Sequence, residues 1–374
     1  MSRRTKFNAI IAIVSLVLSF ALAEIACRLL LPRLGFVARG SDDLPGLWIE
    51  HPVRGYTYSQ NFTGTMSRDD FTIIVKTNEQ GLRVGESRNP LDRSRPIVLA
   101  VGDSLTVGWG VQYEQAWPAQ LERSLNAGQA NGSGPLVVNA GVSGYSMRQI
   151  RQFAMSEFDE LHPRVLMVGV AVAAIDRLRD PYVLFNGILV RESSLPHLRA
   201  TTEGYLFSPM YRPWMKGMDF WFDEHCCFGS YLWKGLYKAW GEASHVGAGL
   251  PVAQPEPSAV ANDGHLQLLL DELEVLRVFT QEKMARLVIV PIAGQAADGT
   301  FSAAQKKVNE RVLVWCREKN VMCIDILSLL DAGSGGEPIY RFKNDSHWNA
   351  LAHRVAAEEM AKRFPRDTVP VRNP

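Results

Sequence analysis

The sequence predicts an α/β fold: a three-layer αβα sandwich around a five-stranded parallel sheet, preceded by a membrane segment. Two observations carry this prediction. Between residues 97 and 364, short apolar stretches alternate with stretches of helical character, which indicates a parallel sheet covered by helices on both faces. The chain also opens with basic residues followed by an apolar stretch, which is typical of an anchor or an export signal.

The first 34 residues form the predicted membrane segment. Arg3, Arg4 and Lys6 precede an uncharged, mostly apolar stretch from Ala9 to Ala23. We expect an uncleaved anchor with most of the chain outside the cytoplasm, although 21–23 (Ala-Leu-Ala) resembles a cleavage site, so secretion after cleavage stays open.

Residues 35–95 are predicted to be a small β-rich lead-in and a linker. A strand is expected over 71–76 (Phe-Thr-Ile-Ile-Val-Lys), and 78–81 (Asn-Glu-Gln-Gly) predicts a turn.

Five strands and five helices are expected after the linker. The strands are Ile97–Val101, Leu136–Asn139, Val165–Val172, Leu287–Pro291 and Val321–Ile326. The helices are Ala116–Asn126, Met147–Leu161, Leu266–Arg286, Ala303–Lys319 and Ala350–Phe364.

The first of these strands ends in Gly-Asp-Ser. Ser104 therefore lies where a buried strand stops and a helix begins, at the carboxyl edge of the sheet. A serine nucleophile needs such exposure and nearby N–H groups. An ordinary helix cap is the alternative interpretation.

Other stretches reach the same edge. A glycine turn, 139–146, follows the second strand, and Asp176 lies beyond the third. Asp345 and His347 are two residues apart in a late loop, so that the carboxylate can orient the imidazole.

Taken together, these motifs resemble the SGNH, or GDSL, hydrolase family over residues 96–370, in a membrane-anchored bacterial branch associated with surface polysaccharide O-acetyl hydrolases and acetyltransferases. The resemblance rests on 78–83, on 102–111, on 139–145 and on the Asp-Ser-His-Trp-Asn segment 345–349. It implies an SGNH/flavodoxin-like fold. It also implies Ser104 as nucleophile, His347 as general base, Asp345 as its orienting partner, and the N–H groups of Ser104 and Gly144 as oxyanion donors.

The chain departs from the family pattern after the third strand. The family places a donor asparagine there, where this chain has Ala173 or Ala174. Three interpretations stay open: the oxyanion hole works with two donors, Asn139 or Asn344 substitutes, or the protein has kept binding and lost activity.

The family core is interrupted by an aromatic-rich insertion at about 180–263. Its aromatic residues either form a core of their own or make a platform for sugar rings beside Ser104. Asp103, Trp214 and Trp221 are the predicted substrate-binding residues.

Composition adds few constraints. The formal net charge of +1 over 374 residues indicates no nucleic-acid partner. Five cysteines define no disulfide framework, and a bridge between Cys316 and Cys323 stays open. A metal site at 225–227 (His-Cys-Cys) lacks a second ligand pair. We expect no metal and no organic cofactor.

The leading functional hypothesis is a serine-dependent carbohydrate-ester hydrolase or O-acyltransferase, acetyl being the favoured acyl group. Its substrate would be an envelope or extracellular polysaccharide or a small acylated molecule, and its site would face the periplasm or the outside of a bacterial cell. A catalytically weak or inactive glycan-binding component of a polysaccharide assembly is the first alternative. A lipid esterase is the second.

Overall fold

A computed structural model describes residues 3–30, 44, 46–68, 70–86, 91–128, 134–185, 188–194, 226, 228–229, 232, 263–331 and 339–365. The chain divides into two compact units. The larger unit comprises residues 44–65, 70–195 and 253–374, and the smaller comprises residues 1–43, 66–69 and 196–252.

The larger unit is built around a five-stranded parallel sheet in the order β12-β11-β8-β6-β7. Its strands are β6 (Ile97–Gly102), β7 (Leu136–Gly141), β8 (Val165–Ala171), β11 (Arg286–Ile292) and β12 (Met322–Cys323). Every residue of β6 and β8 is buried. Continuous apolar strands suit a sheet that is covered on both faces, so the predicted α/β fold is confirmed.

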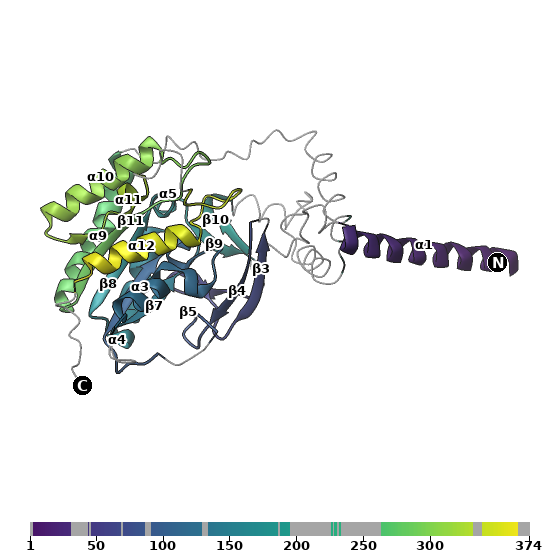
Figure 1. The fold of residues 1–374 in the computed structure, drawn as a ribbon, viewed down its shortest axis with the longest axis horizontal. Coiled ribbons are helices and arrows are strands. Elements are labelled where there is room, and N and C mark those ends of the chain that lie inside the picture. Colours follow the sequence, from purple (N-terminus) through teal and green to yellow (C-terminus); the bar gives the residue numbers. More distant parts are fainter. Residues whose placement is uncertain are drawn as a thin grey trace. The chain divides into compact units, whose positions relative to one another are not determined.

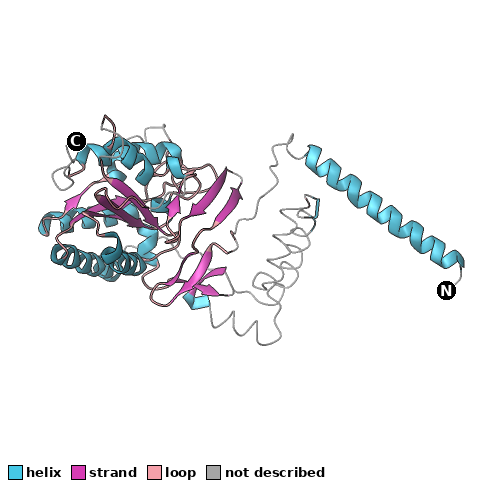
Figure 2. Ribbon diagram, turned by 90° about the horizontal axis from the view of Figure 1, so that it is seen from below, coloured by secondary structure: helices cyan, strands magenta, loops and turns pink. Residues whose placement is uncertain are grey.

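Helices cover both faces of this sheet (Figures 1 and 2). On one face α3 (Trp117–Leu125) packs against α12 (Ala350–Arg363), and on the other α9 (Asp263–Glu282) packs against α4 (Met147–Leu161) and α10 (Ala303–Glu318). The chain runs from β6 outward to β7, then crosses over to β8 and continues through β11 to β12. The strand order therefore reverses between β6 and β8, and ligands in such sheets bind at that point.

Local sequence explains where several helices begin. Ser146 and Gln149 form a reciprocal capping box at the start of α4, and Ser302 and Gln305 do the same for α10. Asn349 caps α12 by accepting a hydrogen bond from the Ala352 N–H at 3.1 Å. Such caps satisfy N–H groups that lack a partner in the first turn.

The lead-in contains more strands than the one expected. They are β1 (Trp48–His51), β2 (Gly55–Tyr58), β3 (Thr63–Arg68), β4 (Phe71–Thr77) and β5 (Arg83–Val84), arranged as the antiparallel pair β1-β2 and a sheet in the order β3-β4-β5. The predicted turn is present, because Asn78 Oδ1 accepts hydrogen bonds from the N–H groups of Gln80 and Leu82.

The remaining described elements are short. They are α2 (Ser104–Val107), the 3-10 helix η2 (Tyr113–Gln115), α5 (Val172–Asp176), the hairpin strands β9 (Tyr182–Phe185) and β10 (Ile188–Arg191), the 3-10 helix η3 (Glu192–Ser194), and α11 (Ile326–Asp331).

Several predicted boundaries differ from the observed ones, and two of the larger differences have a local reason. The fifth strand has only two residues because Asp325 starts a new turn, where its carboxylate accepts the Ser328 N–H at 2.9 Å and caps α11. Helix α9 ends at Glu282, since Met284 takes a left-handed φ of 54° and Arg286 already pairs with Val165 in the sheet.

Cys316 and Cys323 are free cysteines, so the bridge that the sequence left open is absent from the structure.

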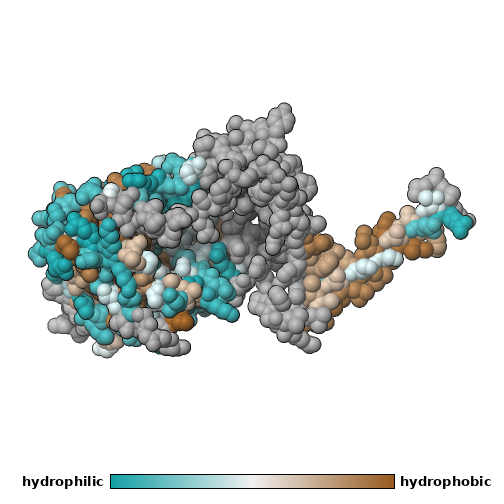
Figure 3. Space-filling view, turned by 90° about the horizontal axis from the view of Figure 1, so that it is seen from above, coloured by the Kyte–Doolittle hydropathy of each residue, from teal (hydrophilic) through white to brown (hydrophobic). Residues whose placement is uncertain are grey.

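In the smaller unit, α1 (Arg3–Leu30) contains a stretch, Arg4–Cys27, that is long and apolar enough to cross a membrane. Figure 3 shows apolar side chains along this helix and a polar N-terminal end. Glu24 interrupts the apolar surface, and its carboxylate accepts hydrogen bonds from the Phe228 N–H at 2.7 Å and the Cys226 thiol at 3.1 Å. Such partners lower the cost of placing a carboxylate on an apolar helix.

Candidate active site

The turn after β6 presents Ser104. Asp103 caps α2 by accepting the Leu105 N–H at 3.1 Å, so that Ser104 is the first residue of this short helix. The turn is tight because Gly102 has no side chain. A Cβ there would lie 2.0 Å from Thr106 Oγ1, which means that any larger residue would push α2 away from the strand ends.

His347 connects Ser104 to Asp345. Its Nε2 lies 2.8 Å from Ser104 Oγ, and its Nδ1 lies 2.5 Å from Asp345 Oδ1. The backbone N–H of His347 donates to the same carboxylate oxygen at 2.8 Å. With a proton on Nδ1 facing the carboxylate, Nε2 is free to accept the serine hydroxyl proton. The structure therefore brings together the three side chains that the sequence singled out.

The loop carrying His347 is fixed against the end of β11. Trp348 is fully buried and donates from Nε1 to the Ala293 carbonyl at 2.7 Å. Gly294 permits this approach, because a Cβ there would lie 2.4 Å from the Ser346 carbonyl oxygen. On another side, the Trp109 ring lies 5.9 Å from the His347 ring, measured between centroids, and restricts the positions open to the imidazole.

Two backbone N–H groups are candidates for an oxyanion hole. Ser104 is the first residue of α2, so its N–H has no acceptor within that helix. Gly144 adopts a φ of 83°, a left-handed conformation that glycine tolerates, and its N–H donates to no acceptor among the described residues.

The assignment of the missing asparagine to Ala173 or Ala174 stays a prediction, and the structure describes part of its surroundings. The residues that line the cleft at the end of β8 are Ala171 and Val172, because the chain enters α5 at once. Ala174 is fully buried instead, and the side chain of Ala173 is outside the described residues.

Asn139 and Asn344, the two residues considered as replacements for the missing oxyanion donor, both use their side-chain amides in other hydrogen bonds. The Asn139 side-chain amide donates to the Val107 carbonyl at 3.3 Å, and the Asn344 amide donates to Asp70 Oδ1 at 3.1 Å. Both amides therefore serve contacts within the fold.

Asp103 was expected to bind substrate, but its carboxylate is occupied by the protein. Oδ1 accepts the Leu105 N–H, and Oδ2 accepts a hydrogen bond from Arg177 Nη2 at 2.6 Å. Arg177 also donates from Nε to the Tyr145 carbonyl at 3.0 Å. Arg177 thus joins the turn of Ser104 to the loop of Gly144.

A cleft of about 480 Å³ opens beside Ser104 and His347. Its walls come from the ends of β6, β8 and β11 and from the starts of α5 and α10, so it lies at the reversal of the strand order. The lining consists of small or apolar residues (Leu105, Ala171, Val172, Ala293, Gly294, Ala296 and Ala304) and polar ones (Asp103, Ser104, Asp176, Arg177, Gln295, Ser302, Gln305, Ser346 and His347).

Asp176 is a half-buried carboxylate in this cleft, and its side chain forms no hydrogen bond with any described residue. Burial raises the pKa of Asp176 above its usual value, although Arg191, His265 and Arg177 oppose the shift. The side-chain amides of Gln295 and Gln305 line the same cleft, but unlike Asp176 they have hydrogen-bond partners. Gln295 and Gln305 donate to the Gly299 and Gly294 carbonyls, so they hold the cleft wall in place.

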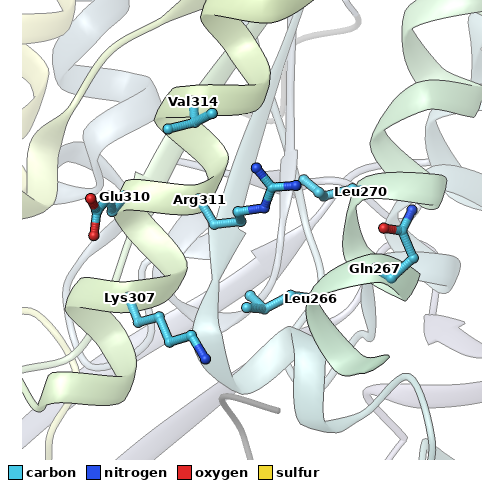
Figure 4. A pocket seen from close by; sticks show the side chains of 7 residues that line it. All are labelled: Leu266, Gln267, Leu270, Lys307, Glu310, Arg311 and Val314. Atoms are coloured by element: carbon cyan, nitrogen blue, oxygen red, sulfur yellow. The ribbon is translucent and has the colours of Figure 1, made fainter. Parts of the chain in front are cut away.

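A second hollow, of about 350 Å³, lies between α9 and α10 (Figure 4). It is lined by Leu266, Gln267, Leu270, Lys307, Glu310, Arg311 and Val314. None of these side chains is a serine, a cysteine or a histidine, so Ser104 and its cleft are the better candidate for acyl transfer.

Some predicted site residues fall outside the described part of the chain. Trp214 and Trp221 are among them, as are His225 and Cys227. Within the described residues there is no cluster of histidine, cysteine and carboxylate side chains able to hold a metal ion.

Sequence patterns did not indicate Arg177 or Trp109 as site residues, because their contacts with Asp103 and His347 arise only in the tertiary fold, and they placed Asp176 at the sheet edge without giving it a role. Trp109 lies within a quoted motif segment, and Asp176 follows a predicted strand, so their positions at the sheet edge were the available signals.

No protein-family model and no curated protein sequence matches the chain. Among solved structures, it is similar to a G-D-S-L family lipolytic protein from Desulfitobacterium hafniense (12% identity, 72% of this chain, 99% of that one, TM-score 0.40). It is also similar to an acetylxylan esterase from Geobacillus stearothermophilus (14% identity, 74% and 97% covered, TM-score 0.41). At such low identity, the substrates of these proteins are not assigned to this chain.

Proposed function

We propose that the protein is a serine-dependent esterase or O-acyltransferase that acts on acylated carbohydrate, acetyl being the favoured acyl group. The observation that carries the proposal is the hydrogen-bonded series Ser104, His347 and Asp345, with separations of 2.8 and 2.5 Å. Nucleophile, base and orienting carboxylate in this order support acyl transfer through a serine ester.

In the first half-reaction, His347 Nε2 takes the proton of Ser104 as Oγ attacks the ester carbonyl carbon. The tetrahedral oxyanion is stabilised by the N–H groups of Ser104 and Gly144. As the C–O bond to the leaving alcohol breaks, His347 returns the proton to that alcohol. Asp345 stays ionised and holds the imidazolium in place.

In the second half-reaction, water or a sugar hydroxyl attacks the acyl-serine. His347 accepts the proton of the attacking group and then returns it to Ser104 Oγ. The same site therefore supports hydrolysis and transfer, and the choice depends on which acceptor reaches the acyl-enzyme.

The lining of the cleft favours a short acyl group on a polar alcohol. Small residues such as Ala171, Ala293 and Gly294 leave room for a compact group, whereas Asp176 offers an acceptor for hydroxyl groups. A long lipid chain would bury the Asp176 carboxylate without a hydrogen-bond partner, which is costly.

A glycan-binding protein without catalysis is the second candidate. The favouring observation is that Ala171 and Val172 line the cleft at the end of β8, where neither side chain donates a hydrogen bond. Loss of one oxyanion donor typically costs about 10²- to 10³-fold in rate.

The test uses the full-length protein in detergent, with a chromogenic acetyl ester and a serine-reactive phosphonate. We expect turnover and labelling at Ser104, with both lost in Ser104→Ala and turnover lost in His347→Ala. Ser156→Ala, an exposed serine on α4, is the matched control and should behave as the wild type. Absence of both turnover and labelling would favour the binding protein. Labelling without turnover would indicate a transferase that needs its own acceptor.

We further propose that α1 anchors the protein in a bacterial inner membrane, with the Ser104 cleft on the periplasmic side. The support is the apolar stretch of 24 residues, Arg4–Cys27, within α1, and the basic residues at the N-terminal end of this helix. Secretion after removal of this helix is the alternative.

A further inference from the structure

Each of the three segments that supply the proposed active site is held by the same part of the lead-in. We define the brace as β2 (Gly55–Tyr58) together with residues 70–84. We propose that the brace positions the oxyanion loop (residues 142–145), the turn after β6 that begins at Ser104 and the His347 loop (residues 344–347), so that this part of the lead-in belongs to the active site. The proposal rests on the proposed function where it concerns rate, and it has a structural test that does not.

The oxyanion loop is held by two tyrosines of β2. The Tyr58 hydroxyl donates to Ser143 Oγ and accepts the Ser143 N–H, both at 3.0 Å. The Tyr56 hydroxyl donates to the Ser143 carbonyl at 3.2 Å. That carbonyl and the Gly144 N–H belong to one planar peptide, so Tyr56 fixes the direction in which this N–H points.

Both tyrosines are suited to this task. They are almost fully buried, and burial raises the pKa of Tyr56 and of Tyr58, so both hydroxyls stay protonated donors at neutral pH. A Cβ on Gly144 would lie 2.7 Å from the Tyr56 hydroxyl oxygen, so the loop fits closely against β2.

The Ser104 turn is held by Arg83 of β5. Its Nη1 donates to the carbonyls of Val107 and Gly108 at 2.6 and 2.5 Å, and its Nη2 donates to the Val111 carbonyl at 2.6 Å. These carbonyls lie at and just beyond the end of α2, where helical acceptors lack partners. Arg83 is 3% exposed, and burial lowers its pKa to about 10, which leaves the guanidinium charged at neutral pH.

The His347 loop is held by the residue that precedes β4. Asp70 Oδ2 accepts the Asn344 backbone N–H at 2.7 Å, and Oδ1 accepts the Asn344 side-chain amide at 3.1 Å. The adjacent Phe71 ring lies 5.1 Å from the Phe342 ring, between centroids. Asn344 is next to Asp345, so these contacts restrict the segment that orients the base.

The three contacts share one consequence. The contacts of Tyr58 and Asp70 end next to Gly144 and Asp345, those of Arg83 begin at Val107 in the short helix that Ser104 starts, and none reaches the cleft itself. Catalysis by a preorganised site depends strongly on position, and a displacement of about 1 Å can cost about 100-fold in rate. Loss of a brace contact should therefore lower kcat and leave KM nearly unchanged.

Asp70 offers the cleanest test, because its contact is exposed and contributes little to stability. We expect Asp70→Ala to speed amide hydrogen exchange at 344–347 by at least about tenfold, without change at 142–145, and to lower kcat by about tenfold. Asp70→Asn should restore both values, since an amide oxygen can still accept the Asn344 N–H. Glu50→Ala, an exposed carboxylate of β1, is the matched control.

Tyr58→Phe is the reciprocal test. It should speed exchange at 142–145, leave 344–347 unchanged and lower kcat at constant KM, while denaturant unfolding shows that the variant is folded. Equal exchange in wild type and Asp70→Ala would overturn the proposal, as would faster exchange with unchanged kcat. If the wild type proves inactive and unlabelled, the proposed function fails, but the exchange measurements still decide whether the brace holds these loops.

Discussion

Arg177 holds Asp103 through a buried ion pair in which Nη2 lies 2.6 Å from Oδ2 and both side chains are at most 9% exposed. Because Arg177 Nε also donates to the Tyr145 carbonyl, one guanidinium fixes the turn of Ser104 relative to the loop of Gly144. A planar fork of donors is suited to such a bridge.

Arg177→Met should therefore lower both stability and activity. It leaves the Asp103 carboxylate buried without its cation, which typically costs about 3–5 kcal/mol. Denaturant unfolding measures the loss of stability. The double variant Asp103→Asn with Arg177→Met should be more stable than Arg177→Met alone, and equal stability would contradict the importance of the pair.

Asp345→Asn should reduce kcat by about 10³-fold or more, because an amide in this position does not stabilise the imidazolium formed on His347. Steady-state kinetics with the chromogenic ester measure this loss. Asp298→Asn, at an exposed turn, is the matched control. A loss below about tenfold would remove Asp345 from the mechanism.

Asp176→Ala, which removes the acceptor oxygens, should affect carbohydrate esters more than small esters. Asp176 lines the cleft with Ser104 yet takes no part in the series of proton transfers. We expect KM for an acetylated oligosaccharide to rise by about five- to tenfold, because one hydrogen bond is worth about 1 kcal/mol. Turnover of the chromogenic acetate should stay within about twofold. Equal effects on both substrates would exclude a role in sugar recognition.

His353 should make the protein acid-sensitive. It is fully buried, its Nδ1 accepts the Trp117 N–H at 3.2 Å, and burial lowers its pKa to about 3. The unfolded chain binds the proton near pH 6.5, whereas the folded chain does so only near pH 3. Stability from the neutral imidazole is therefore present above pH 6.5 and is lost as the pH falls toward 3.

The expected loss between pH 7 and pH 4.5 is about 2–3 kcal/mol for this group. Comparing urea unfolding of wild type and His353→Asn at both pH values isolates this contribution. Asparagine keeps an acceptor for the Trp117 N–H and does not titrate, so its pH dependence should be smaller by that amount. An equal dependence in the two proteins would contradict the assignment.

The α1 helix should remain attached and keep the protein in the membrane fraction after alkaline carbonate washing. Intact mass of the purified chain should include residues 1–34, because Glu24 accepts hydrogen bonds from the 226–228 segment. A mature chain beginning at Glu24 would show cleavage after Ala23 and would favour secretion.

Much of the fold followed from local patterns. Apolar strands such as Ile97–Gly102 and a capped helix such as Met147–Leu161 carry their signals in adjacent residues, so their positions could be predicted closely. The length of the two-residue strand Met322–Cys323 could not be predicted in this way. It depends on pairing with Val288 and Ile289, which belong to a strand far away in the sequence.

For the site, the residue types and their order can be read directly along the chain: a serine after a buried strand, a glycine turn, and an aspartate two residues before a histidine. Sequence does not decide which distant side chains meet. Contacts such as Arg177 with Asp103, Tyr58 with Ser143 and Asp70 with Asn344 join residues far apart in the chain. They exist only once the sheet has brought the strand ends together, so tertiary structure alone decided how the site is held.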